Sequence, residues 1–188
     1  MAVTTPSGST QTITKQGTSS GGPGRAAPAP VTCTSSVPSG ADYLCNTYSM
    51  GRQKAGWRAG AYPLDGIGQH LYVDQGGLTT SAKIASYLQD VRAAYVAFEG
   101  AATPKKTEVT EFGWVADPSS ATYPTDAANQ AQNIQTAYTT FRATAYVSRA
   151  DYFVAQAVPE GSVFYGLVQG DGTTYKPAFA AYQSAAGY

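Results

Sequence analysis

The sequence has few of the residues on which several classes of protein depend. Its 188 residues include a single histidine and two cysteines, and the 12 basic and 12 acidic residues leave no net charge. One histidine without a nearby cluster of cysteines or carboxylates does not supply the ligands of a metal site. A neutral chain offers no basic surface to nucleic acid or to anionic lipid. We therefore predict no metal, no other cofactor and no nucleic-acid partner.

Long apolar runs are absent as well. No run approaches the roughly 20 residues that a transmembrane helix needs, so no membrane partner is predicted. The first 40 residues contain no acidic residue and no continuous apolar stretch of the kind found in a secretion signal. They are rich in glycine, proline, serine and threonine, which leaves little to bury. The predicted organisation is an extended segment over residues 1–41 and a folded domain over residues 42–188.

The two cysteines, Cys33 and Cys45, do not form a CxxC motif. Their spacing is compatible with a disulfide and equally with two free thiols, so both interpretations stay open. The cellular compartment is not determined by the sequence, although an extracellular one is favoured.

The composition gives one weak indication of a ligand. Charged residues make up only 13% of the chain, and there are 14 tyrosines. A surface rich in polar aromatic rings suits neutral, hydroxylated ligands such as sugars. A tyrosine-rich core explains the same composition and is the interpretation that composition alone favours.

From about residue 42 the apolar pattern alternates between two periods. Period-two stretches predict strands, and apolar residues at helical spacing predict helices. The alternation of strand and helix is typical of βα units in a parallel sheet. Strands are expected over 63–73, 105–115 and 150–158, and helices over 79–99, over 126–147 and from Pro177 through 178–184.

Ligands of parallel α/β sheets lie at the carboxyl ends of the strands. In the first strand His70 and Tyr72 share a face near that end. Glu108 and Glu111 are three residues apart, so strict alternation predicts that they point to opposite faces, about 10 Å apart along the strand. Glu111, which ends the second strand, is therefore the candidate site carboxylate. The alternatives without a role in a site are that Glu111 is a surface glutamate and that His70 is a structural histidine, and both are common at such positions.

Three segments in sequence resemble a known family. These are "DGIGQHLY", then "TEFGW" after one helix, then "YFVAQ" with the later "YGLVQGDGTTYKPAFAAY". Together they are similar to the C-terminal part of the retaining glycoside hydrolases that use a (β/α)8 barrel, in particular the cellulase-like and β-xylosidase-like members. The resemblance covers about residues 42–188 and implies strands six to eight of that barrel.

The resemblance also implies roles for individual residues. Glu111 would be the nucleophile of a double displacement, Tyr72 would orient its carboxylate, and His70 would contact sugar hydroxyls. Rings at the strand ends would stack on pyranose rings, and polar groups would line the site. The substrate-binding set implied in this way is His70, Tyr72, Trp114, Phe153 and Gln156.

The sequence departs from this family in its acid/base residue. That glutamate ends the fourth strand in an Asn-Glu pair, and the chain contains no Asn-Glu and no glutamate before Glu99. The expected fold is therefore a partial TIM-type barrel of about three βα units, with an apolar inner face and sheet edges that demand a further partner. We predict a homo-oligomer. The acid would then come from another copy of the chain or from one of four loop or strand-end carboxylates: Asp65, Asp74, Asp117 and Asp171.

The predicted function is hydrolysis of β-glycosidic bonds in a polysaccharide or oligosaccharide, weakened because general acid assistance is typically worth about 10²–10⁴-fold. The alternative is a catalytically silent carbohydrate-binding or interaction protein derived from such an enzyme. A third interpretation is a purely structural remnant that folds by association.

Overall fold

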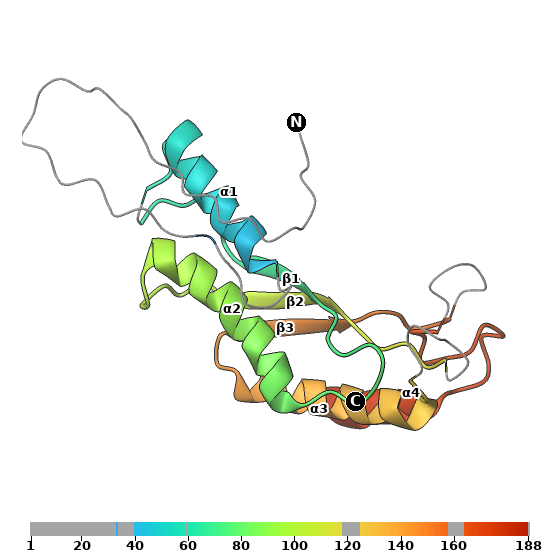
Figure 1. The fold of residues 1–188 in the computed structure, drawn as a ribbon. Helices are drawn as coiled ribbons and strands as arrows, with labels where there is room; N and C mark the ends of the chain where they lie inside the picture. Colours follow the sequence, from blue (N-terminus) through green and yellow to red (C-terminus); the bar gives the residue numbers. More distant parts are fainter. Residues whose placement is uncertain (1–32, 34–39, 59, 118–124, 158–163, 188) are drawn as a thin grey trace, which may run out of the picture. The chain divides into compact units, whose positions relative to one another are not determined.

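The computed structural model describes residue 33 and residues 40–58, 60–117, 125–157 and 164–187 (Figure 1). Most of the predicted extended segment over 1–41 lies outside these residues. No helix of the described part is long and apolar enough to cross a bilayer. In chain order the elements are α1 (Ala41–Lys54), β1 (Ile67–Leu71), α2 (Ser81–Glu99), β2 (Thr107–Phe112), α3 (Ala127–Ala143), β3 (Val147–Tyr152) and α4 (Pro177–Ala186).

Local signals fix most helix ends where the sequence predicts them. The Thr80 hydroxyl accepts from the Lys83 amide at 3.2 Å ahead of α2, and α2 ends at a glycine of positive φ. The Asp126 carboxylate accepts from the Asn129 amide at 2.7 Å and begins α3. Pro177 is in the first turn of α4, where its missing N–H costs nothing.

The strands expected over 63–73 and 105–115 are shorter in the structure, as β1 and β2, and the segment between α3 and β3 differs most from the prediction. The helix expected over 126–147 ends at Ala143, because the Thr144 amide bonds to the Phe141 carbonyl in a closing turn. The third strand then occupies Val147–Tyr152 and not 150–158. The alanine-rich run before the strand continues the helical pattern in the sequence, which is why the pattern alone runs past the turn.

Helix α1 was not predicted. Its buried residues are Ala41, Cys45, Tyr48 and Gly51, which are spaced four, three and three apart. That spacing is a helical stripe. The stripe itself ends in a glycine and the other ten positions are mostly polar, so the stripe is short and easily missed.

The described residues fall into two compact units. The first contains the chain up to Pro63 together with Asp90–Thr103, and the second contains Leu64–Gln89 and the chain from Pro104. Helix α2 contributes its N-terminal half to the second unit and its C-terminal half to the first.

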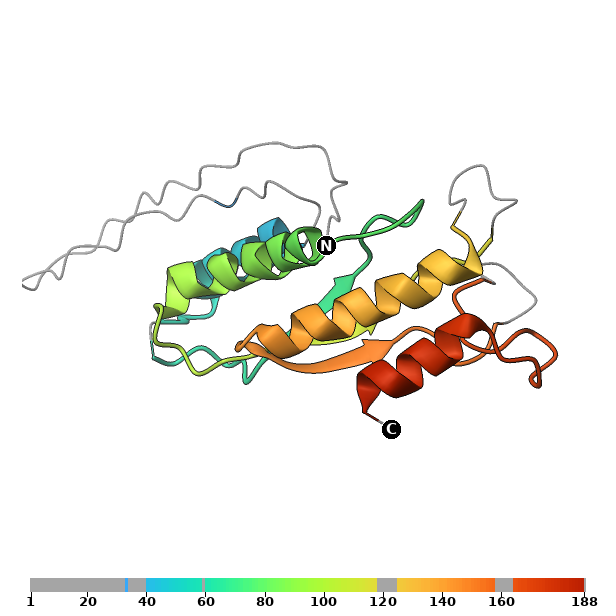
Figure 2. The same ribbon diagram turned by 90° about the horizontal axis from the view of Figure 1, so that it is seen from below.

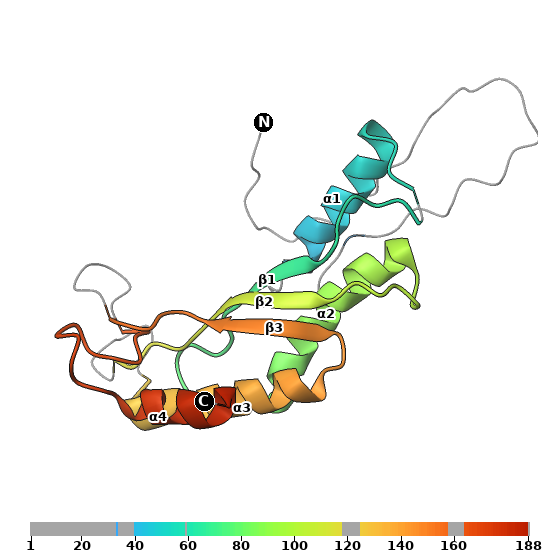
Figure 3. The ribbon, with the colours of Figure 1, turned by 180° about the vertical axis from the view of Figure 1, so that it is seen from behind.

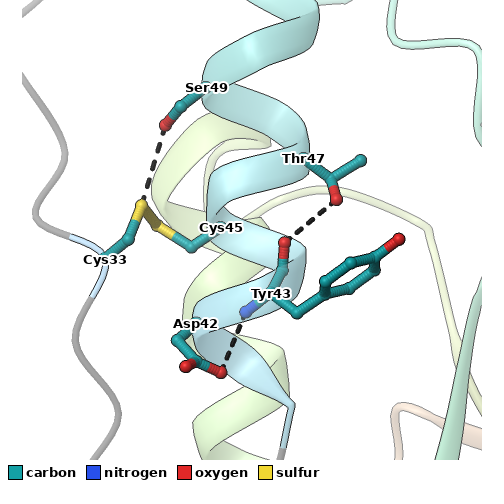
Figure 4. The surroundings of a disulfide bond; sticks show 6 residues. All are labelled: Cys33, Asp42, Tyr43, Cys45, Thr47 and Ser49. Carbon is teal, nitrogen blue, oxygen red and sulfur yellow. Dashed lines mark hydrogen bonds between the residues drawn. A yellow bond between two sulfur atoms is a disulfide. The ribbon is translucent and has the colours of Figure 1, made fainter. Parts of the chain in front are cut away.

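The first unit is built on aromatic packing. The Tyr48 ring stacks on Phe98 at 5.0 Å and meets Tyr62 edge-on at 5.0 Å. The Tyr48 hydroxyl donates to the Glu99 carboxylate, and burial followed by this bond raises the pKa of Tyr48. The disulfide question is settled here, since Cys33 and Cys45 are bonded, with their Cα atoms 5.4 Å apart (Figure 4). The bond fastens residue 33 to α1.

The second unit contains a parallel sheet in the order β1-β2-β3. Helices α3 and α4 lie together on one side of this sheet (Figures 1 and 3) and run in the same direction (Figure 2). The core on that side centres on Phe112, whose ring is surrounded by other rings at 5.0–6.1 Å. These neighbours are Trp114, Tyr138, Phe141 and Tyr152. The prediction of an α/β fold with parallel strands is confirmed.

A β-bulge changes the strand alternation that the sequence predicts. Gln69 pairs with Val109 but His70 pairs with Glu111, so β2 holds one extra residue, Thr110, at this point. Val109 and Phe112 are both fully buried, although they are three apart. The prediction that Glu108 and Glu111 point to opposite faces is therefore wrong, because one inserted residue reverses the parity of every later side chain.

The face of the sheet opposite α3 and α4 is polar. A Cβ placed on Gly66 or Gly68 of the β1 segment would lie 3.7 Å from Glu108 Oε1 or 3.5 Å from Thr110 Cγ2, which puts both side chains on this face. In β3, Arg149 pairs with Asp151 at 2.9 Å. The predicted apolar inner face is therefore wrong. We call this surface the polar face, with the residues His70, Glu108, Thr110, Glu111, Arg149 and Asp151.

Candidate active site

Glu111 lies near the carboxyl end of β2, the central strand. Its Oε2 atom accepts a hydrogen bond from the Tyr72 hydroxyl at 2.9 Å and lies 3.2 Å from His70 Nδ1. The bulge at Thr110 places Glu111 opposite His70 of β1, and Tyr72 follows the same strand. The Glu111 side chain is 35% exposed to solvent. The carboxylate is thus oriented by two partners and still accessible to a ligand.

Tyr72 follows β1 and is half-buried. Burial, and after it the hydrogen bond to Glu111, raises the pKa of the Tyr72 hydroxyl. The phenol therefore keeps its proton at neutral pH and acts as a hydrogen-bond donor. Because Tyr72 bonds to Oε2, the Oε1 atom of Glu111 is the carboxylate oxygen that does not bond to Tyr72 and that could react with a ligand.

His70 lies on the polar face next to Glu111. Its side chain is 60% exposed and its Nδ1 atom contacts Glu111 Oε2, so its role in ligand binding stays a prediction beside that of a hydrogen-bonded structural histidine. An imidazole in this position can bond to a ligand on its outer side and to the carboxylate on its inner side. The structure thus brings together three of the residues that the sequence singled out.

Trp114 is not available to a ligand. It is fully buried, its indole nitrogen donates to the Val73 carbonyl at 2.6 Å, and its ring packs against Phe112. The prediction that Trp114 stacks on a sugar is therefore contradicted. The bulge again supplies the reason, because it directs the residue two beyond Phe112 into the helix-covered core.

Phe153 reaches the site through a residue that the sequence did not single out. The ring of Tyr165 lies 5.8 Å from Phe153 and 5.7 Å from Tyr72, in edge-to-face contact with both. Tyr165 belongs to a segment that carries no periodic pattern. In the sequence it opens the segment "YGLVQGDGTTYKPAFAAY" that carries the family resemblance, but no role was predicted for it.

Gln156 lies apart from this cluster. Its side-chain amide donates to the Gly170 carbonyl at 3.3 Å, and its backbone forms an isolated β-bridge with Val168. A Cβ on Gly172 would lie 3.2 Å from the same amide. These contacts tie Gln156 to the turn at 170–172, and its predicted role in substrate binding stays a prediction.

Two glutamines hold the end of β2 in place. Gln130 of α3 is wholly buried, and its Nε2 donates to the carbonyl oxygens of Trp114 at 2.7 Å and Tyr165 at 3.0 Å. Gln75 donates to the Gly113 carbonyl at 2.8 Å. A single side chain of α3 therefore links β2 to the segment of Tyr165. A polar residue on the apolar stripe of a helix was the signal that could have found Gln130.

Two of the loop carboxylates are already engaged in local structure. Asp171 accepts from the Thr174 hydroxyl and from the Thr173 and Thr174 amides, and these bonds lower its pKa to about 2. It is therefore ionised at neutral pH and is a poor proton donor. Asp74, at a φ of 48°, accepts from the Thr79 hydroxyl at 3.1 Å.

No group of three histidine, cysteine or acidic residues placed to hold a metal ion occurs within the described ranges. The chemistry that the site itself offers is that of an oriented, accessible carboxylate beside a phenol and an imidazole.

Solved structures with the same fold are glycoside hydrolases. A GH128 endo-β-1,3-glucanase from Amycolatopsis mediterranei, in complex with laminaritriose and laminaribiose, matches 74% of this chain with a TM-score of 0.54 and 24% identity. A structure of the same enzyme in complex with laminaripentaose matches with a TM-score of 0.54 and 23% identity. A further structure of that enzyme matches with a TM-score of 0.54 and 20% identity. No protein-family model and no curated protein matches the sequence.

The match covers 50% of the glucanase, so this chain spans about half the length of that enzyme. At these identities the likeness establishes the fold and not the activity. It agrees with the α/β fold and the glycoside-hydrolase resemblance that the sequence predicts.

Proposed function

We propose that the chain carries the nucleophile half of a (β/α)8-type glycoside hydrolase site and cleaves β-glycosidic bonds with retention. The observation that carries this proposal is the Glu111 carboxylate, which a protonated Tyr72 holds at 2.9 Å while the side chain stays accessible. The strands β1, β2 and β3 would correspond to strands six to eight of the barrel. The parallel sheet order and the match to half of a glucanase support this correspondence.

In the proposed mechanism Glu111 attacks the anomeric carbon. The bond to the leaving oxygen breaks as an ester bond to Glu111 forms, and water then hydrolyses the ester. Tyr72 keeps the attacking carboxylate in one orientation, which is the main contribution that positioning residues make to rate. His70, exposed beside it, binds a sugar hydroxyl. Phe153 provides the apolar side of the sugar site, and Gln156 adds a polar contact at its margin.

The proposed substrate class is a β-1,3-linked glucan. The matched enzyme is an endo-β-1,3-glucanase crystallised with laminari-oligosaccharides, and variants with one glutamate replaced bind them in crystals. The Cys33–Cys45 disulfide supports an extracellular location, where disulfides persist and polysaccharides are met.

Proton donation to the leaving group is the step for which the described residues offer least. Among the described residues, the contacts of Glu111 come from Tyr72 and His70 and include no second carboxylate. In a retaining enzyme the two carboxyl groups are about 5–5.5 Å apart. We propose that the acid comes from another copy of the chain or from Asp74 or Asp117, because Asp65 precedes β1 and lies at the amino end of the sheet. Asp171 drops out because of its lowered pKa.

The test uses aryl β-glucosides and aryl β-laminaribiosides whose phenols are good leaving groups. Such substrates need little acid assistance, so they report on the nucleophile. We expect slow turnover by the full chain and a loss of at least about 10³-fold in Glu111→Gln, as expected when a residue essential to the double displacement is removed.

Glu108→Gln is the matched control. It removes a carboxylate from the same strand and the same face, three residues away, and we expect its activity to stay within about twofold of wild type. Equal hydrolysis by wild type and Glu111→Gln would mean that the nucleophile assignment is wrong.

A silent carbohydrate-binding protein is the second candidate, and it is favoured because the contacts of Glu111 within the described ranges come from a phenol and an imidazole and not from a second carboxylate. Binding of laminari-oligosaccharides without turnover, weakened by His70→Ala, would support it. If the chain neither binds these oligosaccharides nor hydrolyses the aryl glycosides, the interpretation as a purely structural remnant is the one that is left.

A further inference from the structure

Tyr165 holds a position between the two sides of the candidate site. Its ring meets Tyr72 edge-to-face at 5.7 Å and an interplanar angle of 74°, and meets Phe153 at 5.8 Å and 66°. Tyr165 also contributes to raising the pKa of Tyr72, after burial and Glu111. The three rings form a continuous row that ends at the hydroxyl bonded to Glu111.

The backbone of Tyr165 is fastened to the core. Its carbonyl oxygen accepts from the Tyr152 hydroxyl at 2.8 Å and from Gln130 Nε2 at 3.0 Å. Tyr152 ends β3 and Gln130 is wholly buried in α3, so the ring is presented by two regular elements although it lies on a loop. A ring held in this way can restrict the neighbour that it touches.

Gly113 provides the space for this arrangement. A Cβ at this position would lie 2.3 Å from the Phe153 carbonyl oxygen and 3.0 Å from Tyr165 Cδ1. The glycine two residues after Glu111 therefore lets β3 and the Tyr165 loop approach the end of the strand that carries Glu111. The close approach and the ring row describe one packed corner beside the carboxylate.

We propose that Tyr165 is a positioning residue, which fixes the Tyr72 ring and through its hydroxyl the orientation of the Glu111 carboxylate. The proposal rests on the function proposed above for Glu111 as a nucleophile. Tyr165 acts through Tyr72 and not by contact with the reacting atoms. Its ring, and not its hydroxyl, is the part that matters.

The first test measures kcat and KM on the aryl β-glycosides. An edge-to-face ring pair is worth about 0.5–1.5 kcal/mol, so Tyr165→Ala should lower kcat roughly 2- to 13-fold while KM stays unchanged. Tyr165→Phe keeps the ring and should retain wild-type kcat. Tyr165→Leu, which keeps apolar bulk without a ring edge, serves if Tyr165→Ala does not fold.

A double-mutant cycle separates positioning from general destabilisation. In the Tyr72→Phe background the hydroxyl link to Glu111 is already broken, so adding Tyr165→Ala should change kcat by less than about twofold. Tyr175→Ala is the matched control, since Tyr175 comes from the same segment, is 62% exposed and contacts Phe179 instead, in a tilted ring pair. Fully additive losses from Tyr72→Phe and Tyr165→Ala would overturn the proposal.

A second readout does not depend on turnover. The chain has four glutamates, so a sample labelled with ¹³C at the side-chain carboxyl gives few signals, and Glu111→Gln assigns the one of interest. In Tyr165→Ala this signal should move in the same direction as in Tyr72→Phe, and in Tyr165→Phe and Tyr175→Ala it should stay in place. An unmoved signal in Tyr165→Ala would overturn the positioning role at any level of activity. If the Glu111 signal moves in Tyr165→Ala but the wild-type protein shows no turnover, the positioning role of Tyr165 is retained and the proposed function is rejected.

Discussion

At the scale of single residues, the carboxylates of the chain differ in what holds them. Glu99 accepts from Tyr48 in an aromatic core, Asp126 caps α3, and Asp171 closes a turn. Glu111 instead faces a phenol and an imidazole on an accessible strand end. Partners that orient a carboxylate without covering it are what a nucleophile needs. This difference separates Glu111 from its neighbours better than its position in the sequence does.

Asp171 gives a prediction for acid stability. Its pKa in the folded chain is about 2, below the ordinary 3.8, chiefly because of the bonds from Thr174. A lowered carboxyl pKa contributes stability that is complete above the ordinary pKa and is lost as pH falls through the folded value. Thermal melts should therefore show wild type more stable than Asp171→Asn at about pH 5–7, with the difference shrinking between about pH 4 and pH 2.

Asp65→Asn, at an exposed loop position, is the control for that series. A difference between wild type and Asp171→Asn that stays constant down to pH 2 would show that the turn does not depend on the charge of Asp171.

The sequence identified part of the candidate site. Glu111, His70 and Tyr72 were found because each ends a recognisable strand. Trp114 was misjudged because exposure depends on the bulge, and Tyr165 was missed because its loop has no period. Contacts between segments distant along the chain leave no local signal for either residue.

At the scale of elements, alternation along β2 decides which side chains share a face. The sequence predicts the strand itself from its apolar residues. It does not predict that Thr110 is an extra residue, since a bulge depends on the pairing with β1. One such residue moves Glu111 onto the polar face and Trp114 into the core.

Helix α1 gives a second prediction, at Gly51. Alanine is favoured over glycine inside a helix by about 1 kcal/mol. Here a Cβ would lie 2.2 Å from the indole of Trp57, which packs edge-on against Tyr48 and Tyr62. Gly51→Ala should therefore lower the free energy of unfolding by about 1–3 kcal/mol, the usual cost of overpacking, as measured by urea denaturation.

Met50→Ala is the matched control, because Met50 neighbours Gly51 in the same helix and is 56% exposed. Its effect should be small. A Gly51→Ala variant more stable than wild type would show that Trp57 moves away at little cost.

At the scale of the whole molecule, the sheet of the second unit is the feature that calls for a partner. In the described part of the chain β1 and β3 each pair on one side only. Unpaired strand edges are sites of association. The polar face itself does not demand cover, contrary to the prediction of an apolar one, so the edges alone carry the expectation of a homo-oligomer.

Light scattering with size-exclusion chromatography should give a mass of at least about twice the 19.6 kDa of one chain. A lysine substituted at an exposed position of β1 other than His70 should shift the mass toward that of one chain, since a charged side chain on an edge strand opposes pairing with another strand. A strict monomer at all concentrations would reject the homo-oligomer.

The sequence by itself determined the alternation of strands and helices, the parallel sheet, most helix ends and the identity of the candidate carboxylate. These follow from residue type, short-range periodicity and capping, which act within a few positions. The tertiary structure decided the disulfide, the bulge, the burial of Trp114, the polar face and the place of Tyr165. Each of these depends on which distant segments meet, because strand pairing and close packing are settled only when the whole chain has folded.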